Sequence, residues 1–308
     1  MLVTEERDGT QRELISQRVD AQAPIGSAFK LYVLAAVADE VAAGKLSWDD
    51  TVRVTPETRS LPSGTLQDEP DGTEVSVRQA AEQMISISDN TATDLLIGLV
   101  GRERVERAVA DLRHAEPEQL RPFLTTREMF QLSAGSGGDG ETAAELGELG
   151  ADWADADESR RRAILERVDE IPLTLTVEQF TGATGGQAVP GWTRGLEWFA
   201  SPADLASAHR ALAERAEKEP LLTEILGKNP GQGLTLDRAA WPEIAFKGGG
   251  NIGVTSGSWR AVGEDGTVLT VVMMMSADTP ADVQAAARAQ QDFFFLAEDI
   301  FRLAAQTP

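Results

Sequence analysis

The pattern of apolar and polar residues differs between the two ends of the chain and its middle. Residues 2–18 contain two short strand-like segments around an Asp-Gly pair, which is typical of a tight hairpin turn. Continuous apolar and β-branched runs return only at 253–262 and 267–275. Because two short strands are not stable alone, these segments predict one antiparallel sheet built from both chain ends. A helix predicted over about 280–305 would cover one face of that sheet.

The middle of the chain has the spacing of helices. Apolar residues recur at helical intervals over several segments, which are 31–43, 75–87, 91–100, 102–112, 126–132, 158–168, 202–217 and 220–226. Apart from 158–168, the segment 133–195 does not follow this pattern. It begins with a glycine-rich stretch over 133–140 that we expect to be flexible, and the remainder is acidic and poorly patterned.

The fold class predicted from these segments is α+β. An antiparallel sheet from both chain termini would be flanked by helices, with a mostly helical lobe from the middle of the chain. The 308 residues are enough for one domain with a substantial core. We expect a single domain, 1–308, with an α/β lobe formed by 1–22 and 245–308. The helical lobe would span 23–244 and carry 133–195 as an atypical insertion.

Composition and charge exclude several classes of function. The net charge of −22 argues against nucleic acid and anionic membrane surfaces, since both require a basic face. Without cysteine there is no disulfide, thiolate nucleophile or cysteine-bound metal. The two histidines, His114 and His209, lie far apart and outside any His-Glu-x-x-His pattern, which disfavours a Ser-His-Asp triad and a metal hydrolase. We therefore expect neither a metal nor a cofactor.

The sequence leaves the cellular compartment open. No segment is long and apolar enough to predict a membrane span, and the first residues lack the basic and hydrophobic regions of a signal peptide. We expect a cytoplasmic protein, or a secreted or cell-envelope protein if this chain is a mature or trimmed form. We also expect a monomer that acts on a small molecule.

Ser27 and Lys30 stand where the chain enters a largely apolar helix. Residues three apart share a helix face, so both side chains are expected to point the same way from the first turn. Apolar surroundings would lower the pKa of the lysine, and a neutral amine can accept the proton of a serine hydroxyl and make it a nucleophile. A Ser-x-x-Lys pattern is weak alone. However, the chain has 23 Arg against five Lys, which favours a chemical role for this lysine.

A second polar segment, Ser88-Asp89-Asn90, lies between two predicted helices. Ordinary capping of the following helix explains part of this segment. In a catalytic interpretation, the Ser88 hydroxyl and the Asn90 amide face a cleft, while Asp89 turns inward and holds the loop.

A third segment, Lys247-Gly248-Gly249-Gly250, comes before the penultimate predicted strand. Glycines allow a ligand to approach the backbone closely, and exposed N–H groups there can bind a developing oxyanion. In a phosphate-binding loop the lysine follows the glycines and a helix comes next, which is not the order here. A glycine cluster that bends the sheet is the plain alternative.

The order Ser-x-x-Lys, Ser-Asp-Asn, Lys-Gly-Gly resembles the motif set of penicillin-binding proteins and class A β-lactamases. Ser27 and Ser88 are 61 residues apart, close to the usual separation in that superfamily. The resemblance covers almost the whole chain except about 133–195. It implies a β-lactamase/transpeptidase-like fold and a serine hydrolase that works through an acyl-enzyme.

The resemblance also implies roles for individual residues. Ser27 would be the acylated nucleophile, Lys30 its proton acceptor or relay, and Ser88 the hydroxyl that passes a proton to the leaving nitrogen. Asn90 would bind the side-chain amide of the substrate. Lys247 would hold the substrate carboxylate and tune Ser88.

The glycines Gly248, Gly249 and Gly250 would lie against the substrate, with the backbone N–H groups of Ser27 and Gly250 as the oxyanion hole. Lys30 and Lys247 would make the cleft locally positive despite the acidic net charge.

The chain departs from the class A pattern between the second and third motifs. Efficient class A enzymes carry a glutamate there in a Glu-x-x-Leu-Asn pattern, which activates the water that releases the acyl group. The nearest match begins at Glu116, but its leucine comes one place late and no asparagine follows. A solvated turn is the plain alternative for Glu116. Ser88 and Lys247 are also 159 residues apart, more than expected for that family. These departures predict slow deacylation.

The sequence therefore favours a β-lactamase-like serine hydrolase that opens β-lactams or related amides and esters. Two alternatives remain open, one that is another enzyme and one that is not an enzyme. One is an esterase or a D-Ala-D-Ala peptidase. The other is a non-hydrolytic sensor domain that binds a β-lactam-like ligand in the same pocket.

Overall fold

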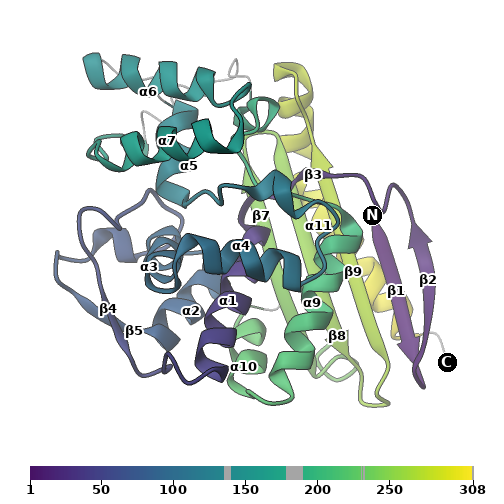
Figure 1. The fold of residues 1–308 in the computed structure, drawn as a ribbon. Helices are drawn as coiled ribbons and strands as arrows, with labels where there is room; N and C mark the ends of the chain where they lie inside the picture. Colours follow the sequence, from purple (N-terminus) through teal and green to yellow (C-terminus); the bar gives the residue numbers. More distant parts are fainter. Residues whose placement is uncertain (135–139, 178–189, 230, 232, 307–308) are drawn as a thin grey trace.

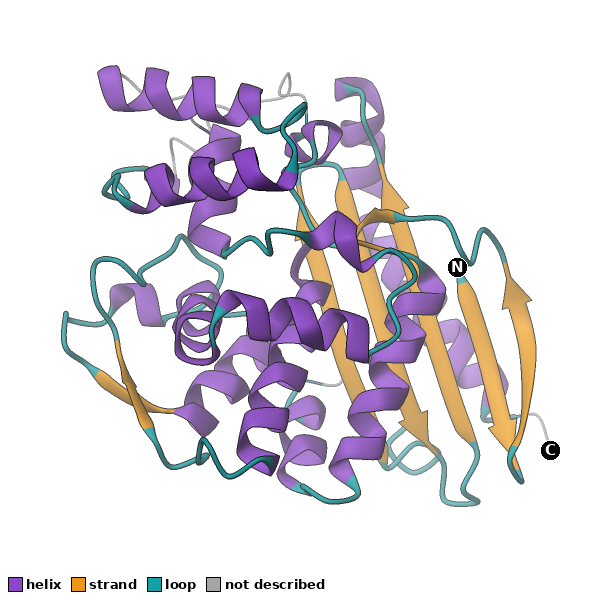
Figure 2. Ribbon diagram, viewed as in Figure 1, coloured by secondary structure: helices purple, strands orange, loops and turns teal. Residues whose placement is uncertain are grey.

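A five-stranded antiparallel sheet forms one side of the protein (Figures 1 and 2). The computed structural model describes residues 1–134, 140–177, 190–229, 231 and 233–306. The strand order is β2-β1-β9-β8-β7. The strands are β1 (Leu2–Arg7), β2 (Thr10–Ser16), β7 (Glu243–Asn251), β8 (Val254–Val262) and β9 (Val268–Ser276). Because β1 pairs with both β2 and β9, the sheet combines the two ends of the chain, and the predicted α+β fold is confirmed.

Helices cover both faces of this sheet. The helix α11 (Pro280–Ala304) packs behind it against β9, and α9 (Pro202–Ala216) and α10 (Leu221–Gly227) pack in front (Figure 1). A capping box at Ser201 begins α9, since its hydroxyl accepts from the Asp204 N–H and the Asp204 carboxylate accepts from the Ser201 N–H. Among the described residues, the strand β7 pairs only with β8 and forms an edge of the sheet, where η1 contacts it.

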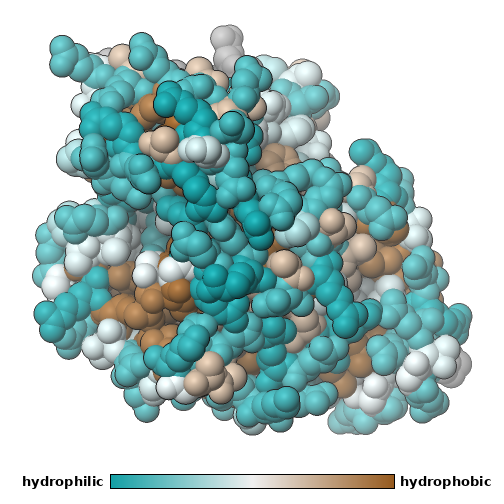
Figure 3. All heavy atoms as spheres, in the orientation of Figure 1, coloured by the Kyte–Doolittle hydropathy of each residue, from teal (hydrophilic) through white to brown (hydrophobic). Residues whose placement is uncertain are grey.

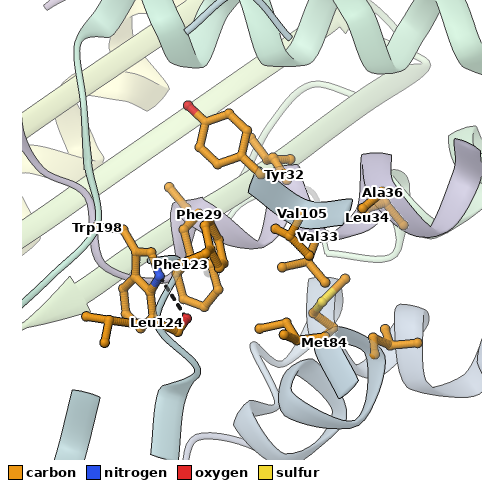
Figure 4. Close-up of a cluster of buried hydrophobic side chains, with 14 of the residues drawn as sticks. Phe29, Tyr32, Val33, Leu34, Ala36, Met84, Val105, Phe123, Leu124 and Trp198 are labelled. Atoms are coloured by element: carbon orange, nitrogen blue, oxygen red, sulfur yellow. Dashed lines mark hydrogen bonds between the residues drawn. The ribbon is translucent and has the colours of Figure 1, made fainter. Parts of the chain in front are cut away.

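In the rest of the chain, the buried helix α1 (Lys30–Ala42) is central. The other helices there are α2 (Val77–Ser86), α3 (Asn90–Val100), α4 (Arg102–Asp111), α5 (Thr126–Ala134), α6 (Glu141–Asp152) and α7 (Glu158–Asp169). Every side chain of α1 from Lys30 to Ala38 is buried. Figure 4 shows part of this core, in which Phe29, Tyr32 and Val33 pack with Met84 and Phe123. A helix that is apolar all round requires such a central position.

Short elements connect these helices. The short helices are η1 (Gly26–Phe29), η2 (Leu66–Asp68), η3 (Pro117–Leu120) and η4 (Gly191–Arg194). Two small antiparallel pairs join β3 (Ala23–Pro24) to β6 (Phe199–Ala200) and β4 (Thr51–Arg53) to β5 (Glu74–Ser76). The outer surface in Figure 3 is mostly hydrophilic, with small apolar patches. No helix among the described residues is long and apolar enough to cross a membrane.

The structure corrects three expectations. Ser27 does not lie on the first turn of the α-helix, because Gly26–Phe29 is a 3₁₀ turn and α1 begins at Lys30. The glycines 248–250 do precede the penultimate strand, β8, as predicted, but they also lie inside a strand of their own, β7. The helix α6 forms within the segment that the pattern left unassigned. Most of the predicted flexible stretch, residues 135–139, lies outside the described residues.

Candidate active site

The three sequence motifs meet at two buried lysines. The Lys30 Nζ donates to the Ser88 Oγ at 3.1 Å, to the Ser88 carbonyl at 2.5 Å and to the Asn90 Oδ1 at 2.6 Å. The Lys247 Nζ donates to the same Ser88 Oγ at 3.0 Å and to the Gly248 carbonyl at 2.7 Å. The Ser88 hydroxyl therefore bridges two amines that are far apart in sequence.

Close contact between η1 and β7 places Ser27 on the wall of the cavity that Asn90 also lines. Gly26 has φ +51°, and a Cβ built on it would lie 2.7 Å from the Gly250 N. A Cβ built on Gly249 would lie 2.7 Å from the Ser27 N. Glycine at both positions therefore lets the two backbones touch. The Ser256 Oγ adds a 2.6 Å hydrogen bond to the Ile25 carbonyl, which fixes η1 against the sheet.

The buried carboxylate of Asp89 holds the loop that carries Ser88. One oxygen of Asp89 accepts from the Thr65 and Leu66 N–H groups at 2.7 and 2.9 Å, and the other accepts from the Ala92 N–H at 2.8 Å. The last bond caps α3. Ser88 itself has φ +59°, a left-handed conformation that costs about 1 kcal/mol or more for a residue other than glycine. The surrounding hydrogen bonds hold this strained residue in place.

Burial changes the protonation of both lysines. Lys30 is completely buried, and desolvation lowers its pKa well below its ordinary value, with a further decrease from the nearby Lys247. Desolvation lowers the pKa of Lys247 to about 7. A lysine with such a pKa is partly a neutral amine at neutral pH, and it can then take up a proton.

A cavity of about 560 Å³ opens beside the network. Ser27, Asn90 and Gly250 line it together with Glu197. Much of the remaining wall is apolar, and it comes from α5, the loop before β6, the β7–β8 turn and α11. These residues are Met129, Phe130, Trp198, Ile252, Val254, Val283, Ala286 and Ala287. Such a mixture of an apolar wall and a few polar groups is typical of a small-molecule site.

Glu116 does not belong to this cavity. It is exposed at the start of η3, its carboxylate accepts a hydrogen bond from the Gln119 side chain, and it is absent from the cavity wall. The departure from the Glu-x-x-Leu-Asn pattern is explained by this position, because the segment forms a solvated 3₁₀ turn. The structure thus corrects the expectation that Glu116 faces the substrate.

The structure instead brings in Glu197, which the sequence analysis missed. Its side chain is buried, its Oε2 accepts from the Asn251 Nδ2 at 2.8 Å and its Oε1 accepts from the Trp198 N–H at 3.0 Å. Desolvation raises its pKa to about 7, although both hydrogen bonds act in the opposite direction. The available signal was one acid inside the apolar run Leu196-Glu197-Trp198-Phe199.

Neither histidine contacts the nucleophile candidate. The His114 Nε2 hydrogen-bonds to the Phe199 carbonyl at 2.9 Å, and the His209 Nε2 lies 3.0 Å from the Ser258 Oγ. His209 is buried between α9 and β8, and desolvation lowers its pKa to about 4. Within the described part of the chain, no group of three or more His, Asp or Glu residues is arranged to bind a metal ion.

Comparisons with known proteins concern the family and the fold. The sequence model of the Beta-lactamase2 family, described as a β-lactamase enzyme family, matches residues 2–238. No curated protein sequence matches the chain significantly.

Solved structures share the fold at low sequence identity. A β-lactamase from Sphaerobacter thermophilus is 22% identical, with a TM-score of 0.58 over 99% of this chain and 90% of that one. The chromosome-encoded β-lactamase of Vibrio parahaemolyticus is 16% identical, with a TM-score of 0.62 over 99% and 94%. A mutant of PBP-A in an acyl-enzyme complex with penicillin G is 14% identical, with a TM-score of 0.60 over 99% and 90%.

Proposed function

The chain belongs to the β-lactamase enzyme family, and from this premise we propose that it is a serine hydrolase that acts through an acyl-Ser27 intermediate. Its substrates would be β-lactams or related amides and esters. The observation that carries this proposal is the pair of hydrogen bonds from Lys30 and Lys247 to one Ser88 hydroxyl, beside a cavity that Ser27 lines. This cavity would be the cleft between the α/β lobe (1–22 and 245–308) and the helical lobe (23–244).

Acylation would begin at Ser27. The neutral amine of Lys30 accepts the hydroxyl proton while the Ser27 Oγ forms a bond to the substrate carbonyl carbon. The carbonyl oxygen becomes an oxyanion and accepts hydrogen bonds from the backbone N–H groups of Ser27 and Gly250. The closeness of η1 and β7 at Gly26 and Gly249 supports this oxyanion site.

Release of the leaving group needs a proton donor on the other side of the substrate. The Ser88 hydroxyl gives its proton to the leaving nitrogen or oxygen as the bond to the carbonyl carbon breaks. The amines of Lys30 and Lys247, both within 3.1 Å of the Ser88 Oγ, resupply that proton. Asn90 and the backbone from Gly248 to Gly250 would orient the substrate through hydrogen bonds.

The test uses intact-protein mass spectrometry after incubation with benzylpenicillin. We expect an adduct of the mass of the penicillin, or its hydrolysed product without an accumulated adduct. Ser27→Ala should give neither. If the wild-type protein reacts neither with penicillin nor with an ester or peptide substrate, or if Ser27→Ala behaves like the wild-type protein, this assignment is wrong.

A comparison of substrates distinguishes the alternatives. Turnover of a chromogenic cephalosporin would support a β-lactamase, and turnover of an acetyl ester or a D-Ala-D-Ala peptide alone would support an esterase or peptidase. A permanent adduct with no turnover of any of these compounds would support a sensor domain.

A further inference from the structure

We propose that Glu197 is the general base that activates the water molecule which releases the acyl group from Ser27. This inference rests on the proposed acyl-Ser27 intermediate and adds the residue that completes the hydrolytic cycle. Glu197 and Ser27 line the same cavity. Among the described residues of the cavity wall, Glu197 is the one whose side chain carries a carboxylate.

Stacked rings fix the backbone of Glu197 beside the turn that carries Ser27. The ring of Trp198 stacks on Phe29, with centroids 3.7 Å apart and planes 18° from parallel. The Trp198 Nε1 also donates to the Leu124 carbonyl at 3.1 Å (Figure 4). Phe29 belongs to η1, as Ser27 does. A carboxylate on the residue before Trp198 is therefore held in a defined position relative to the nucleophile, as general base catalysis requires.

The contacts of the Glu197 carboxylate favour a proton acceptor rather than a structural ion pair. Both of its hydrogen bonds come from neutral donors, the Asn251 amide and the Trp198 N–H. No arginine, lysine or histidine of the described residues forms an ion pair with it. Each carboxylate oxygen keeps a lone pair for a further donor such as water. Asn251 directly follows Gly250 in β7, so the carboxylate is tied to the strand that offers the oxyanion donor.

Three other titratable groups border the same region. Lys30 donates to Asn90, and Lys30 and Lys247 both donate to the Ser88 Oγ. Asp94 accepts from the N–H and the hydroxyl of Thr126, which lines the cavity. None of them is hydrogen-bonded to Glu197. The raised pKa of Glu197, about 7, arises from desolvation and places its ionisation in the physiological range.

Hydrolysis of the acyl-enzyme balances through this one carboxylate. The water oxygen forms a bond to the acyl carbonyl carbon while Glu197 takes one water proton. The tetrahedral intermediate then breaks the bond between that carbon and the Ser27 Oγ, and Glu197 returns the proton to the Oγ. The products are a carboxylic acid and the free Ser27 hydroxyl. Since only ionised Glu197 can accept the proton, acyl release should be slow in acid and accelerate as the pH rises towards 7.

The experiment compares Glu197→Gln with Glu116→Gln by rapid-quench mass spectrometry with benzylpenicillin from pH 5 to pH 9. In Glu197→Gln, we expect acylation within about three-fold of wild type and a lifetime of the acyl-enzyme longer by about 100-fold or more. Its release rate should also lose the rise with pH. Glu116→Gln should keep the wild-type lifetime and pH profile. Normal acylation by Glu197→Gln shows in the same measurement that the variant is folded.

The outcomes separate this inference from the proposed function. A wild-type lifetime and pH profile in Glu197→Gln, with normal acylation, would overturn the role of Glu197 and leave the acyl-Ser27 intermediate standing. A prolonged lifetime in Glu116→Gln alone would assign the base to Glu116 and overturn it as well. If the wild-type protein reacts with neither penicillin nor the other substrates, both proposals fall together. Should Glu197→Gln not acylate, Glu197→Asp provides the second test, with acylation retained and release slowed.

Discussion

The Lys247 side chain holds an amine in an almost water-free position, and this has a thermodynamic consequence. Its pKa is about 7 in the folded protein and near its ordinary value of 10.5 in the unfolded chain. The unfolded chain therefore binds more protons between pH 7 and pH 10.5, so the free energy of unfolding rises with pH across this window. At ~1.4 kcal/mol per pKa unit, the rise from Lys247 amounts to up to about 5 kcal/mol.

Lys247→Met should remove this contribution. We expect the variant to gain less stability than the wild type between pH 7 and pH 10, as measured by urea unfolding at several pH values. Lys218→Met, which replaces an exposed lysine, is the matched control and should keep the wild-type slope. Equal slopes in wild type and Lys247→Met would contradict a lowered pKa at this residue.

At the residue scale, sequence reasoning found the groups that belong to short patterns. The spacing from Ser27 to Lys30 and the triplet at Ser88 are local, so they could be recognised before any fold was known. Glu197 has no such pattern around it. Its raised pKa arises because the fold buries its side chain and sets it against Asn251, and no local rule predicts that contact.

The contact between η1 and β7 supplies a test at the scale of elements. Gly249→Ala would force a Cβ to 2.7 Å from both the Ser27 N and the Ser256 Oγ. We expect a loss of stability of about 1–3 kcal/mol and a large loss of acylation, because the backbones of η1 and β7 must separate. Thermal unfolding and the rate of penicillin adduct formation measure the two effects.

Gly250→Ala is the neighbouring control. A Cβ on Gly250 would have its nearest neighbour at 3.9 Å, the Val254 carbonyl, and the backbone N–H is kept. This variant should change stability by about 0.5 kcal/mol or less, and only stability is compared, because Gly250 itself lines the cavity. If both substitutions have the same effect, close packing at Gly249 is not what the site requires.

Elements with a strong local pattern were predictable, and elements made by long-range contact were not. The hairpin of β1 and β2 has its Asp-Gly turn, and α1 has its continuous apolar run. The pairs β3 with β6 and β4 with β5 contain strands of two or three residues, too short to show a period of two. Lys247 lies in β7, and the glycines of this strand make it hard to predict from sequence, because glycine has low strand propensity.

Charge acts on the molecule as a whole. The net charge of −22 repels anionic substrates, and the burial that lowers the pKa values of Lys30 and Lys247 reduces the positive charge which the sequence analysis expected in the cleft. Screening weakens this repulsion, since the Debye length falls from about 30 Å at 0.01 M salt to about 8 Å at 0.15 M.

We therefore expect the second-order rate constant for acylation by an anionic penicillin to rise by about two-fold or more over this range of salt. Acylation by a neutral ester should change little, which controls for effects of salt on the protein itself. A fall in the rate with the anionic substrate would show that local positive charge outweighs the net charge.

The overall architecture was predictable because strand-like sequence is concentrated at the two chain ends and helical sequence lies between them. The order of the strands was not, since the pairing of β1 with β9 joins residues more than 260 positions apart. Such pairing depends on which edges remain open once the helices have packed, and that is a property of the assembled molecule.

The position of β1 between β2 and β9 also bears on how the protein is made. Translation completes β1 long before it reaches β9, and at ~5–20 residues per second the interval is roughly 15–50 s. Throughout that time the first hairpin has an unpaired backbone edge, which invites association with other nascent chains. The sheet therefore stays unfinished until β9 has been made, and the cavity beside Ser27 is complete only once α11 has followed it.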